Sequence, residues 1–135
     1  MSYPDNFLRG ISDKTLVSDG AILAAAFYFT QQSTIDQWDQ SICWEDNDAV
    51  VALMKSQQRN NEVQFKAGIA RVPRNSINYI NALPMYRGLL SYERKALEGN
   101  PYHGNLLLYK DTSKQKMKLV AAVIAAHFSD FISQP

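Results

Sequence analysis

The feature that most constrains this fold is the C-terminal segment, residues 112–132, where apolar side chains recur with the period of a long helix. At about 100° per residue the larger ones share one broad face; these are Met117, Val120, Val123, Ile124, Phe128 and Phe131. The opposite side carries Leu119, Ala122 and Ala126, so a second element can approach closely. We expect a central helix, capped by Asp111 or Thr112 and covered on most sides. His127 falls within the apolar arc, which predicts a neutral core imidazole.

Length, cysteine content and hydropathy bound the class of protein. A chain of 135 residues suits one globular domain, residues 1–135. Its one cysteine, Cys43, excludes an intramolecular disulfide, and with only two histidines it supplies no zinc ligand set. The N-terminus lacks a signal-peptide pattern, and the longest apolar run, residues 21–29, is about half of what a bilayer span requires. We expect a cytoplasmic protein with no membrane partner, metal or cofactor.

The remaining segments predict further helices and two strands. Helical patterns fall in residues 3–17, 21–32, 34–44, 49–58, 76–83 and 84–98, the third of them only partial. A strand at residues 26–30 is the alternative within the second segment. Strands are expected at residues 63–72, with a bulge at Gly68, and at residues 106–110, paired antiparallel. The predicted fold is α+β and mainly helical, with four or five helices around the C-terminal one and a small antiparallel β pair.

The net charge of +1 hides an asymmetry between the two halves of the chain. Residues 1–62 carry a net charge of −5 and residues 63–135 a net charge of +6. Two interpretations follow. Either the halves attract each other within one domain, which we weigh more heavily, or the basic half faces an anionic partner.

Sequence motifs with a mechanism of their own are absent. The chain has no Gly-rich phosphate loop, no His-Glu-x-x-His, no Cys-x-x-Cys pair and no Gly-x-Ser-x-Gly elbow. The most plausible catalytic group is His103, in a predicted turn with Tyr102 beside it. Glu93 falls within the apolar arc of the predicted helix at residues 84–98, where a carboxylate needs a partner or acquires a raised pKa, and Arg94 follows it. These four residues are candidates for a metal-free acid–base site.

The basic half also mixes tyrosines with basic residues, a composition typical of binding surfaces. Aromatic rings and cations suit single-stranded RNA, and tyrosine and arginine equally dominate protein interfaces. Three lysines begin the last helix, where free backbone N–H groups favour a phosphate-bearing ligand. The candidate binding residues are Arg71, Arg74, Tyr86, Arg87, Tyr92, Lys114, Lys116 and Lys118.

The leading functional hypothesis is a small protein–protein interaction module of the adaptor, inhibitor or immunity type, with no catalysis. It rests largely on the missing catalytic motifs. The alternative is a metal-independent, nuclease-like enzyme or RNA-binding protein that uses His103 and Glu93 beside the basic patch. A homodimer through the alanine-rich side of the last helix is compatible with either hypothesis.

Overall fold

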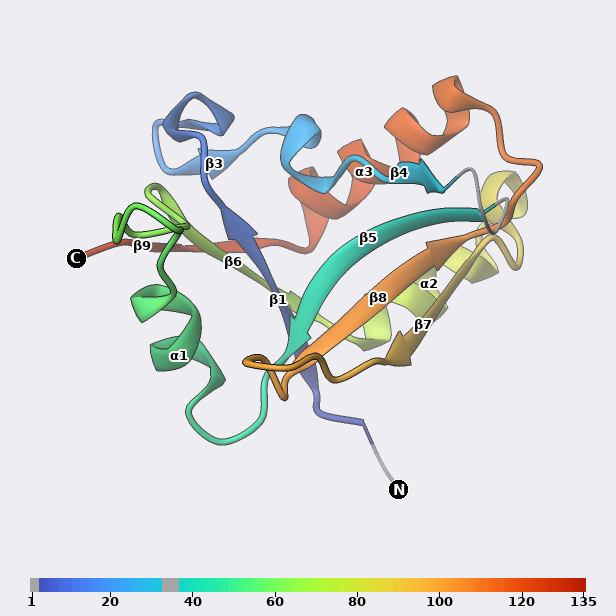
Figure 1. The fold of residues 1–135 in the computed structure, drawn as a ribbon. Coiled ribbons are helices and arrows are strands. Elements are labelled where there is room, and N and C mark those ends of the chain that lie inside the picture. The colour runs from blue at the N-terminus through green and yellow to red at the C-terminus, as the bar shows by residue number, and fades with distance from the viewer. Residues whose placement is uncertain (1–2, 33–36) are drawn as a thin grey trace.

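The computed structural model describes residues 3–32 and 37–135, and its centre is a seven-stranded antiparallel sheet (Figure 1). The strand order is β7-β8-β5-β1-β6-β9, and β4 also pairs with β5. The bounds are β1 Asn6–Ile11, β4 Thr30–Gln32, β5 Gln37–Trp44, β6 Gly68–Pro73, β7 Leu90–Arg94, β8 His103–Leu108 and β9 Asp130–Ser133, with a separate pair formed by β2 Val17–Ser18 and β3 Ala21–Ile22. The α-helices are α1 Ala49–Lys55, α2 Asn75–Ala82 and α3 Lys114–His127, and the 3-10 turns are η1 Lys14–Leu16, η2 Ala24–Phe27 and η3 Pro84–Tyr86.

Strand β5 organises the sheet. Its residues alternate between two faces, as a period of two requires; Trp38, Gln40, Ile42 and Trp44 are buried on the face that carries the main core. One side of β5 pairs with β8 from Trp38↔Leu108 to Cys43↔His103. The other side pairs with β4 at its start and with β1 only at Phe7↔Trp44 and Leu8↔Cys43. Beyond these two pairs β1 and β5 diverge.

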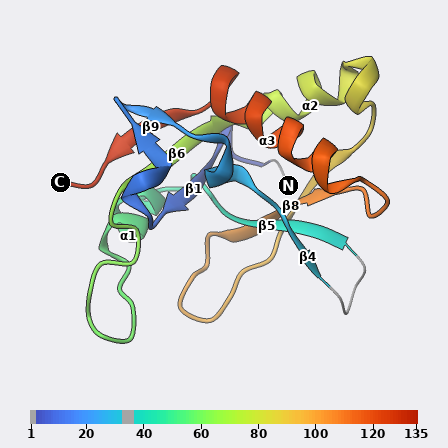
Figure 2. The same ribbon diagram turned by 90° about the horizontal axis from the view of Figure 1, so that it is seen from above.

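One face of the sheet is covered by α2, α3 and η2, and Figure 2 shows α2 and α3 side by side there. Helix α3 buries Met117, Val120, Ala121 and Ile124 against the strands, which confirms the core-facing part of the predicted helix. The helix lies on this face and not at the centre of the molecule. Its cap is Ser113, whose hydroxyl accepts a hydrogen bond from the Lys116 N–H at 3.1 Å.

The far side of α3 is open, which differs from the sequence prediction in two respects. Leu119 is 44% exposed and Ala126 is exposed, so no second element of the described chain covers this side. His127 is also exposed, and the prediction of a core imidazole is wrong. The chain leaves the helical pattern at Phe128, and Phe131 lies in β9, next to β6.

The opposite face of the sheet carries a smaller apolar cluster under α1. Leu8, Cys43 and Ile69 project from β1, β5 and β6, and they pack against Ala49 and Leu53 of the helix. Helix α1 falls within the predicted residues 49–58, and α2 agrees with the helical turns predicted at residues 76–83.

The prediction of a mainly helical fold is wrong, because several apolar segments form strands. Residues 84–98 were expected to be a helix, but they form η3 and then β7, in which Leu90, Tyr92 and Arg94 alternate with Ser91 and Glu93. Gly88, at φ 68°, separates the two elements. Gly99, at φ 80°, does not close a helix; it lies in the turn of the β7–β8 hairpin, beside the Leu97↔Asn100 bridge.

The other corrections concern the N-terminal third and the strand pairing. Residues 3–17 contain β1 in place of a short helix, and residues 21–32 divide into β3, η2 and β4. The partial helix predicted at residues 34–44 is strand β5 from Gln37, and residues 34–36 lie outside the described residues. The two predicted strands exist as β6 and β8, but β6 pairs with β1 and β9 whereas β8 pairs with β5 and β7. Gly68 begins β6, at φ 140°.

Candidate functional site

Two of the four candidate catalytic residues share one face of the β7–β8 pair. Glu93 lies opposite Asn105, and its Oε1 accepts a hydrogen bond from the Asn105 amide at 3.0 Å. His103, two residues before Asn105 on β8, has its Nδ1 2.9 Å from the carbonyl oxygen of Lys95. A carbonyl only accepts, so Nδ1 carries a proton in this contact.

The other two candidates make contacts of their own. Arg94 follows Glu93 on the same strand and therefore projects from the opposite face. Its guanidinium pairs with Asp46 at 2.8 Å, which raises the pKa of Arg94, and lies 5.6 Å from the centre of the Tyr3 ring. The hydroxyl of Tyr102 donates a hydrogen bond to Asp48, which lowers the pKa of that carboxyl. The structure does not bring the four residues together, and their catalytic role stays a prediction.

The candidate binding residues are similarly dispersed. Arg71 forms a bidentate ion pair with Glu45, and Arg74 donates to the Pro4 carbonyl at 2.9 Å and to the hydroxyl of Tyr92 at 3.4 Å. Through Tyr92, Arg74 adjoins the cluster of Tyr3, Trp44 and Tyr92 at one end of the sheet. Tyr86 is buried in the core. Arg87, Lys114 and Lys118 are exposed and Lys116 is half-buried, all in or next to the helical layer.

The two halves of the chain compensate part of each other's charge. Arg71 and Arg94 belong to the basic half, and their partners Glu45 and Asp46 belong to the acidic half. Within the described residues these pairs support the intramolecular interpretation of the charge asymmetry. The lysines of α3 remain at the surface, and Lys118 lies 5.6 Å from the centre of the Tyr28 ring.

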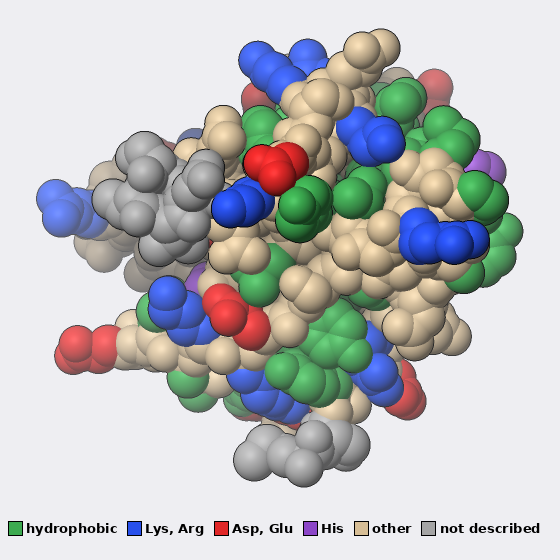
Figure 3. All heavy atoms as spheres, turned by 90° about the vertical axis from the view of Figure 1, so that its right-hand side faces the viewer, with side chains coloured by type: hydrophobic (Ala, Val, Ile, Leu, Met, Phe, Trp, Pro, Cys, Tyr) green, Lys and Arg blue, Asp and Glu red, His purple; other side chains and the backbone are tan. Residues whose placement is uncertain are grey.

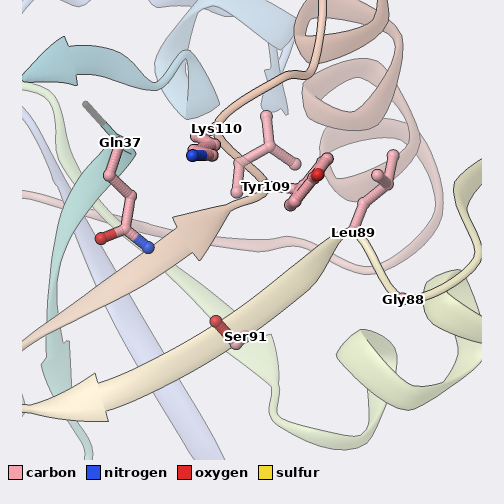
Figure 4. Close-up of a pocket in the computed structure, with 7 residues that line it drawn as sticks. Gln37, Gly88, Leu89, Ser91, Tyr109 and Lys110 are labelled. Atoms are coloured by element: carbon pink, nitrogen blue, oxygen red, sulfur yellow. The ribbon is translucent and has the colours of Figure 1, made fainter.

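Three hollows are candidates for ligand or partner binding, and the first lies where β7, β8 and β5 reach one edge. It has a volume of about 370 Å³, and Figure 4 shows Gln37, Ser91, Tyr109 and Lys110 around it. Tyr109 is 53% exposed, and Leu89 and Gly88 complete the rim. The lining combines one cation and one exposed ring, without a second charged group, so it offers little specific chemistry.

The second hollow is a groove between α2 and α3, with a volume of about 340 Å³. We call it the helical groove; its lining is Tyr79, Leu83, Val123, His127 and Phe128. Tyr79 is 60% exposed, and its ring meets that of Phe128 edge-on at 5.5 Å between centres. The sequence pattern assigned Val123 and Phe128 to the core, and Tyr79 was one of the tyrosines of the basic half but not a candidate binding residue. The helical period alone does not show how far a helix extends beyond the sheet that it covers.

The third hollow lies on the other face of the sheet, where β1 and β5 diverge, and has a volume of about 380 Å³. We call it the strand cleft. Its floor is formed by residues 8–10 and 41–43, and its walls come from α1, the following loop and the β7–β8 hairpin. Among its lining residues are Arg9, Cys43, Phe65, Asn100 and His103. Only His103 was a sequence candidate, because the cleft exists through strand register and leaves no local pattern.

Hydrogen bonds and burial fix the positions of the polar groups in the strand cleft and shift the pKa values of two of them. The Asn100 amide donates to the Cys43 Sγ at 3.5 Å, and burial raises the pKa of the Cys43 thiol, which therefore stays protonated at neutral pH. The Nε of Arg9 donates to the Ala26 carbonyl at 3.0 Å and its Nη1 to the Ser41 carbonyl at 2.8 Å. Burial lowers the pKa of the Arg9 guanidinium.

Comparison with known proteins identifies no relative: no family model, no curated protein and no solved structure matches the chain. No described helix is long and apolar enough to cross a membrane. Among residues 3–32 and 37–135, no group of three or more His, Cys, Asp or Glu side chains is placed to hold a metal ion. The function therefore has to be argued from the three hollows and the surface around them.

Proposed function

We propose that the chain is a cytoplasmic protein-interaction module that binds an acidic, amphipathic segment of another protein in the helical groove. The observation that carries this proposal is the exposure of large apolar side chains at and around the groove. Tyr79 is 60% exposed, and Met85, on the 3-10 turn that follows α2, is 61% exposed. Clustered apolar exposure of this kind marks interaction sites on soluble proteins.

The charge around the groove supports an acidic partner. Residues 74–92 and 112–129, which contain α2, η3 and α3, include five Lys and Arg residues and no Asp or Glu. Figure 3 shows one face of the molecule on which Lys and Arg side chains are interspersed with hydrophobic ones and with a few Asp and Glu side chains. An excess of cations on the segments that form the helical layer favours an apolar segment flanked by carboxylates, because opposite charges steer the encounter and exclude basic partners.

The test compares two designed helical peptides with the same apolar positions, one carrying glutamates and the other lysines on the polar face. We expect calorimetry to detect binding of the acidic peptide only. Tyr79→Ala should weaken that binding by about 2 kcal/mol, the effect of an interface hot spot. Tyr109→Ala is the matched control, since Tyr109 is 53% exposed and lies outside the groove, and it should leave the affinity unchanged.

Three outcomes would contradict the proposal. The first is no binding of the acidic peptide at low salt, and the second is equal loss in the two tyrosine variants. The third is tight binding of a mixed single-stranded RNA whose affinity falls steeply with salt, which would favour the nucleic-acid hypothesis. If the chain cleaves RNA and His103→Ala abolishes the cleavage, that activity belongs to His103. If sedimentation shows a dimer that Tyr79→Ala dissociates, the partner is a second copy of the chain.

A further inference from the structure

Arg9 is the residue from which we argue a second binding site, because it spans the opening between two strands. It lies on β1 just beyond the last pair that β1 makes with β5, Leu8↔Cys43. Its two hydrogen bonds reach backbone carbonyls of η2 and β5, Ala26 and Ser41. The side chain therefore leaves β1 on the face that η2 covers, and the guanidinium lies in the opening between β1 and β5, at the floor of the strand cleft.

The charge of Arg9 has no counter-charge in the described part of the chain. The ion pairs there join Glu62 to Lys66, Glu45 to Arg71 and Asp46 to Arg94, and no carboxylate lies within ion-pair distance of Arg9. Both of its acceptors are neutral, and its Nη2 has no hydrogen-bond partner among the described residues. A cation that is partly removed from water without an anion is costly, and an arriving anion recovers that cost.

The walls of the cleft suit the apolar body of a small molecule. Phe65 covers Gly10 so closely that a Cβ at Gly10 would lie 2.2 Å from the ring. Leu53 of α1 and Leu97 of the β7–β8 hairpin face the same space. Its volume of about 380 Å³ is that of a small-ligand pocket, and such pockets combine apolar walls with a few fixed polar groups.

We propose that the strand cleft binds a small organic acid, with its carboxylate on the Arg9 guanidinium and its apolar body against Phe65 and Leu53. A single guanidinium matches one carboxylate, whereas a phosphate dianion would find one cation and apolar walls. The Asn100 amide and the protonated Cys43 thiol add no charge. The site is separate from the helical groove, which lies on the other face of the sheet.

The experiment is an amide-detected NMR titration of the whole chain with hexanoate and benzoate, each compared with its neutral amide and with inorganic phosphate. We expect both carboxylates to shift the signals of Gly10, Ser41 and His103, with affinities at least about tenfold above those of the amides. Phosphate at the same concentrations should shift these signals little. Equal affinity of acids and amides, or no shift of these three signals, would overturn the proposal.

Variants test the role of the charge. Arg9→Met should abolish the preference for acids over amides, and Arg9→Lys should retain part of it. Because Arg9 also holds two carbonyls, a second variant, Leu97→Glu, adds a carboxylate at the exposed cleft wall without altering Arg9. Because Leu97 is also part of the apolar wall, both ligands should bind more weakly, but hexanoate should lose about tenfold more affinity than hexanamide. Val51→Glu, at a similarly exposed site of α1 outside the cleft lining, is the control, and equal weakening there would contradict a local site.

Discussion

Two parts of strand β5 differ in how their backbone groups find hydrogen-bond partners. At the closed end, around Trp44, β5 lies between β1 and β8, and the ring of Trp44 is buried against Phe7 and Tyr92. Toward the other end, around Gln40 and Ser41, β5 lies between its pairs with β1 and its pairs with β4; we call this stretch the open end. There, side chains supply the hydrogen-bond donors for backbone carbonyls. The guanidinium of Arg9 donates to the Ser41 carbonyl, and the side-chain amide of Gln40 donates to the Phe27 carbonyl at 2.8 Å.

This difference shows which part of the sheet has polar groups available to bind a ligand. At the closed end the strands are paired and the rings are packed, and two of the nearby arginines, Arg71 and Arg94, have carboxylate partners. At the open end side chains provide the hydrogen-bond donors. The Oε1 of Gln40 has no hydrogen-bond partner among the described residues. A ligand gains most where the protein's own groups are incompletely paired.

The largest expected effect is at the closed end. Trp44→Ala removes a fully buried ring, its contacts with Phe7, and the hydrogen bond from its Nε1 to the Glu93 carbonyl at 3.1 Å. The free energy of unfolding should fall by about 3–5 kcal/mol. Urea denaturation followed by circular dichroism measures this change. A loss below about 1 kcal/mol would show that the closed end does not anchor the sheet.

The open end should respond less strongly. Arg9→Met keeps an apolar stem but leaves the Ala26 and Ser41 carbonyls without their donor. Since hydrogen bonds from a charged donor to an enclosed acceptor are stronger than neutral ones, we expect a loss of about 1–3 kcal/mol. The same denaturation at low and high salt should give nearly equal losses. A loss as large as that of Trp44→Ala would remove the distinction between the two ends.

The ion pair of Arg71 with Glu45 should contribute still less. The bond from Nη2 to Oε2 is 2.6 Å, but the side chains are 38% and 19% exposed, so water screens part of the interaction. A double-mutant cycle with alanine at each position should give a coupling of about 0.5–1 kcal/mol. The coupling should shrink in high salt, unlike the cost of Arg9→Met. A salt-independent coupling would indicate a more enclosed pair than the exposure suggests.

The smallest effect concerns the exposed bond between Tyr102 and Asp48. This bond lowers the pKa of Asp48, so its stabilisation exists at neutral pH and is lost as the pH falls through that lowered pKa. It raises the pKa of Tyr102, so the stabilisation is also lost as the pH rises through that raised pKa. Wild type and Tyr102→Phe should therefore differ in stability at pH 7 and converge at acidic and strongly alkaline pH. A difference constant across pH 2–12 would contradict the assignment.

The sequence could predict the elements in which local pattern and tertiary environment agree. The α3 face of Met117, Val120 and Ile124 has a helical period long enough to leave no alternative, and α1 and α2 were also located. The helix predicted at residues 84–98 was wrong because the apolar residues there fit a helical arc as well as strand alternation. Only pairing with β8 decides between these two readings.

The residues of the candidate site were still harder to predict from local sequence patterns. His103 was predicted from its residue type, and the structure places it among the residues that line the strand cleft. Arg9 carried no signal, since an arginine in an alternating segment reads as a solvated residue. Its environment depends on β1 leaving β5 after one particular pair, Leu8↔Cys43, and that pair joins residues far apart in the chain.

The sequence by itself determined the single cysteine, the opposite charges of the two halves and the long apolar face of the last helix. These are properties of composition or of contacts within one turn of helix. The tertiary structure decided the seven-stranded sheet, the groove beside Tyr79 and the cleft at Arg9, because each requires segments distant in sequence to meet in one register. Hydrophobic burial is not directional, so a pattern of apolar residues requires a core without specifying which strands will pair to enclose it.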